Sequence, residues 1–214
     1  MRPVLEHLSP SDVHDQINGF PRRYVQDWKN WLEVSTCFDA GPTPVSISVA
    51  QKFGEILWNW RACGRFQHPL DAMELFETLK KALPFLDALG DSNLRTFHFP
   101  TDSLRELIRS LWTVFYDGLC MKGTAGHVAI TKAILLITRG RIGPAFDSNV
   151  KRALGIRYLP NSESLVSFLS SLAKQLLVFE DQYAVRIESL VPIDRGPVAV
   201  GRAVDMLLGP KERH

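Results

Sequence analysis

One carboxylate, Asp147, stands alone in the most basic stretch of the chain. Residues 121–160 contain seven Lys and Arg side chains and this single acid, a net charge of +6, whereas the other 174 residues carry 18 cations and 22 acids, a net charge of −4. A positive region on an acidic body attracts polyanions while the body stays soluble. The pattern indicates a phosphate-binding surface around one carboxylate, or else a chance cluster of charges on a solvated face.

Two glycines in the same stretch are spaced to form an anion-binding turn. Gly123 and Gly126 come just before a segment rich in Ala and Ile that has helical periodicity. A Gly-x-x-Gly turn lets backbone N–H groups approach an anion, and the helix N-terminus that follows adds partial positive charge. The alternative is an ordinary turn between two helices.

Asp147 has two interpretations that are compatible with each other. It precedes Ser148 at the expected start of a helix, where an Asp side chain commonly caps the first backbone N–H groups. The partial positive charge of a helix N-terminus also favours the ionised form of the carboxyl group. We therefore expect Asp147 to be a helix cap, a catalytic carboxylate, or both.

Two polar residues of the expected helix over residues 127–139, which precedes Asp147, are further candidates. Lys132 would pair with Asp147 if it points inward and would contact phosphate if it points outward, and an ordinary exposed lysine is the simplest interpretation. His127 would contact a phosphate or a base, or else have a structural role. No second His or carboxylate lies at metal-ligand spacing, so we expect neither a metal nor a cofactor.

A pair of charges near the C-terminus also has two interpretations. Arg202 and Asp205 are spaced i, i+3 on an expected helix. On the surface such an ion pair contributes little to stability. In the interior, Arg202 would instead hold a buried carboxylate in place.

Aromatic side chains at helical spacing supply either the hydrophobic core or the walls of a base-sized pocket. Core packing is the more common use of such residues. The residues considered for a pocket are Trp58, Trp60, Trp112, Phe115 and Tyr116.

The elements that must position these residues are helices, because apolar residues recur every three or four positions and no segment alternates with period two. The sequence predicts an all-α fold, a compact globule of about eight to ten helices. These helices form one unit over residues 1–214, or two lobes on either side of the basic window, residues 121–160. The expected helices cover residues 11–20, 22–35, 45–64, 69–89, 98–118, 127–139, 145–155, 161–185 and 197–208.

Helix boundaries are predicted from capping residues and prolines. Pro69 is expected at the first position of its helix, and Pro84 is expected to kink or end the same helix. The alternative N-caps of three other helices are Ser9 or Ser11, Thr101 or Ser103, and Asn161 or Ser162.

Cysteine usage and the N-terminal sequence favour a cytoplasmic protein. Cys37, Cys63 and Cys120 are far apart and odd in number, which indicates reduced, half-buried thiols. The first 15 residues contain no apolar run typical of a signal peptide. The longest apolar run, residues 133–137, is far too short to span a bilayer, so we expect no membrane association.

Residues 122–156, KGTAGHVAITKAILLITRGRIGPAFDSNVKRALGI, resemble the segment that carries the helix-hairpin-helix and the catalytic aspartate in the superfamily of endonuclease III, alkyladenine and adenine DNA glycosylases. In that superfamily a Gly-rich hairpin, an Ala-rich helix and a Gly/Pro turn precede an aspartate and a small hydroxyl residue. The segment also resembles a bacterial family distantly like these glycosylases, in which catalysis is not established.

The resemblance implies double-stranded DNA as the partner and Asp147 as the catalytic carboxylate. Such a group stabilises the oxocarbenium-like state that forms as the glycosidic bond of a flipped-out base breaks. Together with the charge pattern, the resemblance gives the candidate nucleic-acid-binding residues Lys122, Gly123, Gly126, His127, Lys132, Arg139, Arg141, Lys151 and Arg152.

This chain departs from the superfamily pattern directly after the hairpin. The lysine that bifunctional members use as a nucleophile follows the hairpin at once, where this chain has His127, and Lys132 comes about one turn later. The departure argues against a lyase step and, since no metal is expected, the resemblance implies a monofunctional, metal-free glycosylase. The alternative is a non-catalytic all-α protein on the same scaffold that binds DNA or a protein partner.

Overall fold

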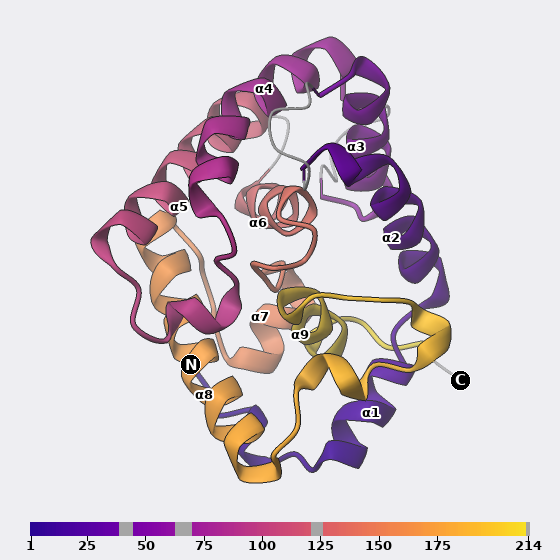
Figure 1. Ribbon diagram of the computed structural model, residues 1–214, viewed down its shortest axis with the longest axis vertical. Coiled ribbons are helices and arrows are strands. Elements are labelled where there is room, and N and C mark those ends of the chain that lie inside the picture. The colour runs from indigo at the N-terminus through magenta and orange to yellow at the C-terminus, as the bar shows by residue number, and fades with distance from the viewer. Residues whose placement is uncertain (39–44, 63–69, 121–125, 213–214) are drawn as a thin grey trace.

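A computed structural model describes residues 1–38, 45–62, 70–120 and 126–212 (Figure 1). Within these ranges the chain forms nine α-helices and no strand, which confirms the prediction of an all-α globule with eight to ten helices. The helices are α1 (Pro10–Asn18), α2 (Arg22–Val34), α3 (Ile47–Asn59), α4 (Ala72–Leu89), α5 (Asp102–Phe115), α6 (His127–Ile137), α7 (Ser148–Leu154), α8 (Ser162–Tyr183) and α9 (Val200–Leu208).

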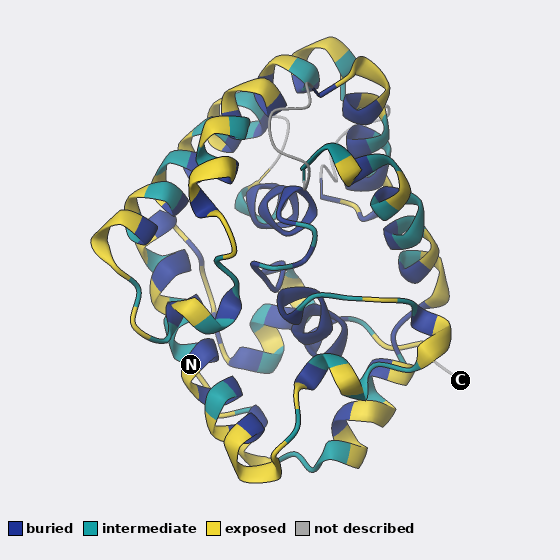
Figure 2. Ribbon diagram, viewed as in Figure 1, coloured by how far each residue is buried: buried dark blue, intermediate teal, exposed yellow. Residues whose placement is uncertain are grey.

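α6 lies at the centre of the molecule, where Figure 1 shows it nearly end-on among the other helices. Every residue from Ala129 to Ile137 is buried, whereas α4, α5 and α8 each expose an outer face (Figure 2). A helix that is apolar on all sides is stable only when other elements cover it completely. Any polar side chain on α6 must therefore find its partners inside the protein.

Capping residues begin most of the helices as expected. Ser9 caps α1 and forms a reciprocal capping box with Asp12, Thr101 caps α5, and Asn161 caps α8. Each side-chain oxygen accepts a hydrogen bond from a backbone N–H in the first turn, which would otherwise lack a partner. In all three cases the first of the two alternative caps is the one used.

The two proline predictions for α4 have different outcomes. Pro69 lies outside the described residues, and α4 begins at Ala72, where Asp71 Oδ1 accepts from the N–H groups of Met73 and Glu74 at 2.9 and 3.0 Å. The prediction that the helix could end at Pro84 is wrong, since α4 continues to Leu89. Buried residues before and after the proline pack against the core, and this packing offsets the lost backbone hydrogen bond.

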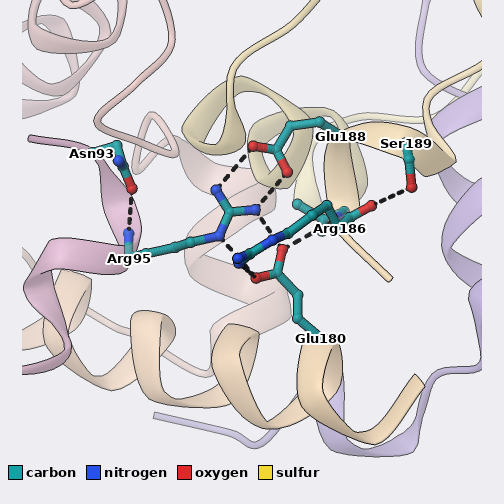
Figure 3. Close-up of polar contacts among 7 residues, drawn as sticks. Asn93, Arg95, Glu180, Arg186, Glu188 and Ser189 are labelled. Atoms are coloured by element: carbon teal, nitrogen blue, oxygen red, sulfur yellow. Dashed lines mark hydrogen bonds and ion pairs between the residues drawn. The ribbon is translucent and has the colours of Figure 1, made fainter. Parts of the chain in front are cut away.

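A buried carboxylate ties three elements together on the side of the molecule where α8 ends (Figure 3). Arg95, in the 3-10 segment Leu94–His98, donates to Glu180 of α8 at 2.8 and 2.5 Å and to Glu188 at 2.9 and 2.6 Å. Arg186 and the Ile187 N–H also donate to Glu180, at 2.9 and 3.1 Å. Burial raises the pKa of Glu180, but these hydrogen bonds outweigh it and hold the pKa below its ordinary value of 4.5.

We expect Glu180→Gln to lower the free energy of unfolding by about 2–3 kcal/mol, because Arg95 and Arg186 then lose their hydrogen bonds to a charged carboxylate. Since folding lowers the pKa of Glu180, the carboxylate stabilises the protein above pH 4.5, and this contribution is lost as the pH falls through the folded-state value. Urea unfolding at pH 7 and pH 3.5 measures both effects. The control is Glu163→Gln, which removes an exposed partner of Arg109 and should change nothing measurable. Equal losses in the two variants would contradict the prediction.

Candidate functional site

A pocket of about 880 Å³ opens where several parts of the chain meet: the residues around the start of α2, the residues that end α3, the first half of α6, the residues around the start of α7, and α9 with the residues after it. Its volume lies in the range of small-molecule and cofactor sites. Within the described ranges, the lining residues are Phe20, Tyr24, Trp60, Arg61, Ala62, Gly126, Val128, Lys132, Ala145, Asp147, Ser148, Asn149, Lys151, Arg202, Asp205 and Pro210.

Burial separates the rim of this pocket from its floor. Arg61 and Ser148 are exposed and Lys151 is half-buried, so these side chains form the rim. Arg202 and Asp205 are buried, with 1 and 7 % of their surfaces exposed, and form the floor. The pocket thus has cations at its mouth and an ion pair at its base.

Asp147 lines the same pocket, is half-buried like Lys151, and lies close enough to Asp205 on the floor for the two charges to interact. Its Oδ1 accepts from the N–H groups of Asn149 and Val150 at 2.8 and 3.0 Å, so the side chain is the N-cap of α7. Among the described residues, none donates a hydrogen bond to the second oxygen, Oδ2. The capping prediction is confirmed, and the cap leaves one carboxylate oxygen for a ligand in the pocket.

The segment that carries Asp147 is held by side chains from two helices. The Ala145 N–H donates to Asp205 Oδ1 of α9, and the Phe146 N–H donates to Thr131 Oγ1 of α6, each at 3.0 Å. The Asp147 N–H donates to the Ala145 carbonyl at 2.8 Å. Three consecutive backbone N–H groups are thus fixed, which sets the position of the carboxylate before any ligand arrives.

The Arg202 guanidinium is enclosed by three aromatic rings. Its central carbon lies 4.8 Å from the ring centroid of Trp60 and 5.0 Å from those of Phe20 and Trp28. A guanidinium over an aromatic face is attracted by the ring quadrupole, most strongly where water is excluded. These contacts join α9 to α2 and to the end of α3.

Arg202 also forms a buried ion pair. Its Nη1 donates to Asp205 Oδ2 at 2.5 Å, and its Nη2 donates to the Tyr24 carbonyl at 3.1 Å. The pKa of Asp205 is raised above its ordinary value, because burial and the Asp147 charge raise it by more than the Arg202 guanidinium lowers it. Of the two interpretations of this pair, the structure confirms that Arg202 holds an internal carboxylate and excludes the surface ion pair.

Close backbone contact brings α9 to this position. The Arg202 N–H donates to the Gly140 carbonyl at 2.9 Å, and Gly140 has a φ of +77°. A Cβ atom on Gly201 would lie 2.7 Å from that carbonyl oxygen and 2.6 Å from the Gly143 nitrogen. Only glycine at position 201 allows α9 to pack this closely against the turn before Asp147.

Lys132 points inward rather than into solvent. Its side chain lines the pocket, 7 % of its surface is exposed, and its ammonium donates to the Trp60 carbonyl at the end of α3. The interpretation of Lys132 as an ordinary exposed lysine is therefore wrong. The cause is its position on α6, because this helix has no solvent-exposed face from Ala129 to Ile137.

The other predicted nucleic-acid-binding residues separate into two groups. Gly126 and Lys151 line the pocket, whereas Arg152 is exposed on α7 outside it. Arg139 and Arg141 follow the far end of α6, and the Arg141 guanidinium donates to backbone carbonyls, including that of Gly90. The structure does not bring these two arginines to the pocket. Lys122 and Gly123 lie outside the described residues.

His127 has structural contacts beside the pocket rather than within it. Its Nδ1 lies 2.9 Å from the Leu159 carbonyl oxygen, which can only accept, so this nitrogen is the donor. Its ring centroid lies 5.3, 6.1 and 6.3 Å from those of Trp112, Tyr116 and Tyr158.

Of the five aromatic candidates, Trp60 alone lines this pocket. Phe115 is fully buried in the core, and Trp112 packs against His127. Sequence reasoning missed Phe20 and Tyr24 as pocket residues, because the helical stripe that contains Tyr24 predicts a core position. It also missed Arg61, which lies outside the basic window and carries no local signal.

Metal-ligand clusters, membrane-spanning helices and cysteines would each indicate a different type of site in the described residues. Nowhere in the ranges above do three or more His, Cys, Asp or Glu side chains gather as metal ligands. None of the helices described has the length and apolar character needed to cross a bilayer. Cys37 and Cys120 are free and half-buried, as predicted, and burial raises the pKa of the Cys120 thiol to about 11. Cys63 lies outside the described residues.

No protein-family model, curated protein or solved structure matches this chain. The site must therefore be interpreted from its own residues. Its distinguishing features are a fixed carboxylate, cations at the rim, aromatic walls and a buried ion pair at the floor.

We expect Arg202→Met to lower the free energy of unfolding by about 3–5 kcal/mol, because Asp205 is left buried without its counter-ion. In the double variant Arg202→Met/Asp205→Asn, the uncompensated charge is gone, so much of this loss should be recovered. Urea unfolding of both variants and of Asp205→Asn completes a double-mutant cycle. Strictly additive losses would show instead that the aromatic contacts of Arg202, and not the ion pair, provide its contribution.

Proposed function

We propose that this protein binds nucleic acid at the pocket and excises a base, with Asp147 stabilising the oxocarbenium-like state. The observation that supports the proposal most strongly is the position of Asp147. One oxygen fixes the carboxylate to the start of α7, and the other is left for a ligand in an aromatic-walled pocket. Preorganised charge of this kind stabilises a developing opposite charge without reorganisation during the reaction.

The pocket has groups suited to each part of a flipped-out nucleotide. Arg61 and Lys151 at the rim suit the phosphates, and the rings of Tyr24 and Trp60 suit the base. The sugar would then lie beside Asp147, between rim and floor. An acid at this depth is close to the anomeric carbon, where positive charge develops when a glycosidic bond breaks.

The surroundings of Lys132 favour a monofunctional reaction. A lyase step requires an amine that is free to attack the sugar. The Lys132 ammonium donates to the Trp60 carbonyl and is attracted by Asp205, an arrangement that suits a fixed positive charge. The residue directly after Gly126 is His127, which bonds to the backbone.

The alternative is a non-catalytic protein that binds nucleic acid or a protein partner with the same pocket. The observation that favours it is the capping role of Asp147, since an N-cap requires an acid or amide there without any chemistry. Under this alternative the rim cations still bind phosphate, but no base is released.

We expect Asp147→Asn to lower the rate of base release at least about 100-fold while DNA binding is retained. Asn is as good an N-cap as Asp, so the substitution removes the charge and keeps the helix start. The measurement is mass spectrometry of free bases released from genomic DNA that has been alkylated, oxidised or deaminated.

A matched control separates catalysis from capping. Asp71 caps α4 through one oxygen and two N–H groups, as Asp147 caps α7, but it does not line the pocket. Asp71→Ala should lower the melting temperature without changing base release at a temperature where the variant is folded. If wild-type protein binds DNA and releases no base from any of these substrates, the non-catalytic alternative is correct.

We expect Lys151→Gln to weaken binding to duplex DNA of any sequence and to reduce the slope of log K against log salt by about 1. The reason is the loss of one rim cation facing a phosphate. Fluorescence anisotropy between 50 and 200 mM salt measures the slope.

Arg152→Gln is the matched control, because Arg152 is the next residue of α7 and lies outside the pocket. It should leave the salt dependence unchanged. Equal effects of the two substitutions would mean that the basic window as a whole, and not the pocket rim, binds the phosphates.

A further inference from the structure

The floor of the pocket contains a hydrogen-bond acceptor with unused capacity. Asp205 Oδ1 accepts from the Ala145 N–H, and Oδ2 accepts from Arg202. An ionised carboxylate has about four lone-pair sites, so these two bonds leave room for two more donors. The Asp205 side chain taken alone is 10 % exposed, and it lines the pocket.

The surroundings of Asp205 keep this acceptor fixed, and the hydrogen-bonded Arg202 guanidinium favours its ionised form against the effect of burial. The adjacent guanidinium of Arg202 is enclosed by three rings and cannot turn away from the carboxylate without leaving them. Exchange of this partner for water would leave a buried charge unpaired, which is strongly unfavourable. A ligand therefore meets a preorganised carboxylate at the floor.

The charge of the pocket determines which donors suit this carboxylate. Arg202 already balances Asp205, and the described lining residues include three further cations, Arg61, Lys132 and Lys151, against one further acid, Asp147. A positively charged base would be repelled by this excess. The acceptor is therefore suited to a neutral base that presents N–H groups.

Building on the proposed function, we propose that Asp205 is a specificity-determining residue that selects a base with two adjacent donors, the guanine-type edge of a ring N–H beside an exocyclic amino group. The two donors match the two unused acceptor sites of one carboxylate. A uracil-type edge places two carbonyl oxygens beside its single N–H, and these oxygens would face the carboxylate. Adenine- and cytosine-type edges pair one amino donor with a ring-nitrogen acceptor.

The order of the pocket from rim to floor agrees with this assignment. The donor edge of a base points away from its sugar, so a nucleotide whose sugar lies beside Asp147 directs that edge toward the floor. Asp147 and Asp205 are close enough for their charges to interact. The aromatic side chains that line the same pocket suit a flat ring system.

Calorimetric binding of free nucleosides to the wild-type protein tests the assignment without DNA and without catalysis. Guanosine presents both donors, inosine lacks the amino group, and 2-aminopurine riboside lacks the ring N–H. We expect each analogue to bind about tenfold more weakly than guanosine, because a hydrogen bond to a charged group is lost. Equal affinities for the three nucleosides would overturn the inference.

Two acids of the same pocket provide the variant and its control. Asp205→Asn replaces one acceptor oxygen by a donor and should abolish the preference for guanosine, whereas Asp147→Asn should retain it. A preference that survives in Asp205→Asn would assign recognition to another residue. If Asp205→Asn does not fold, the wild-type nucleoside series still decides the question.

The outcome is separable from that of the proposed function. Base release without a guanosine preference would leave the function standing and refute the role of Asp205. A guanosine preference without base release would support the role of Asp205 and favour the non-catalytic alternative.

Discussion

The Arg202 guanidinium is buried at the point where the N-terminal helices, the end of α3 and α9 meet. Its ion pair with Asp205, its hydrogen bond to the Tyr24 carbonyl and the three rings around it link segments that are far apart in the chain. A buried guanidinium is tolerated only when charge, hydrogen bonds and ring contacts together replace its hydration. The floor and much of the wall of the pocket depend on this arrangement.

The position of Asp147 depends on the same arrangement through the backbone. Asp205 holds the Ala145 N–H, and Gly201 allows α9 to approach closely enough for that bond to form. On the other side, Thr131 of the buried helix α6 holds the Phe146 N–H. The Asp147 carboxylate is therefore positioned by α6, which precedes it in the chain, and by α9, which follows it. Its hydrogen bonds to the first turn of α7 fix the direction in which it points.

The cations that are close together in residues 121–160 lie in different parts of the folded protein. Lys132 lies inside the pocket and Lys151 at its rim, while Arg141 binds backbone carbonyls elsewhere. Arg61, from a distant part of the chain, adds a cation at the mouth. The positive surface relevant to a polyanion is thus smaller than the window and is assembled from several segments.

The sequence by itself determined the helices, most of their caps and the place of Asp147 at a helix start, because these features depend on residues within one turn of each other. It did not determine that Lys132 and Arg202 point inward, or that Phe20 and Tyr24 line a pocket. The partners of these side chains lie far away in sequence, as with Lys132 and the Trp60 carbonyl, 72 residues apart. Which polar group is buried is decided by packing between helices, and only the tertiary structure contains that information.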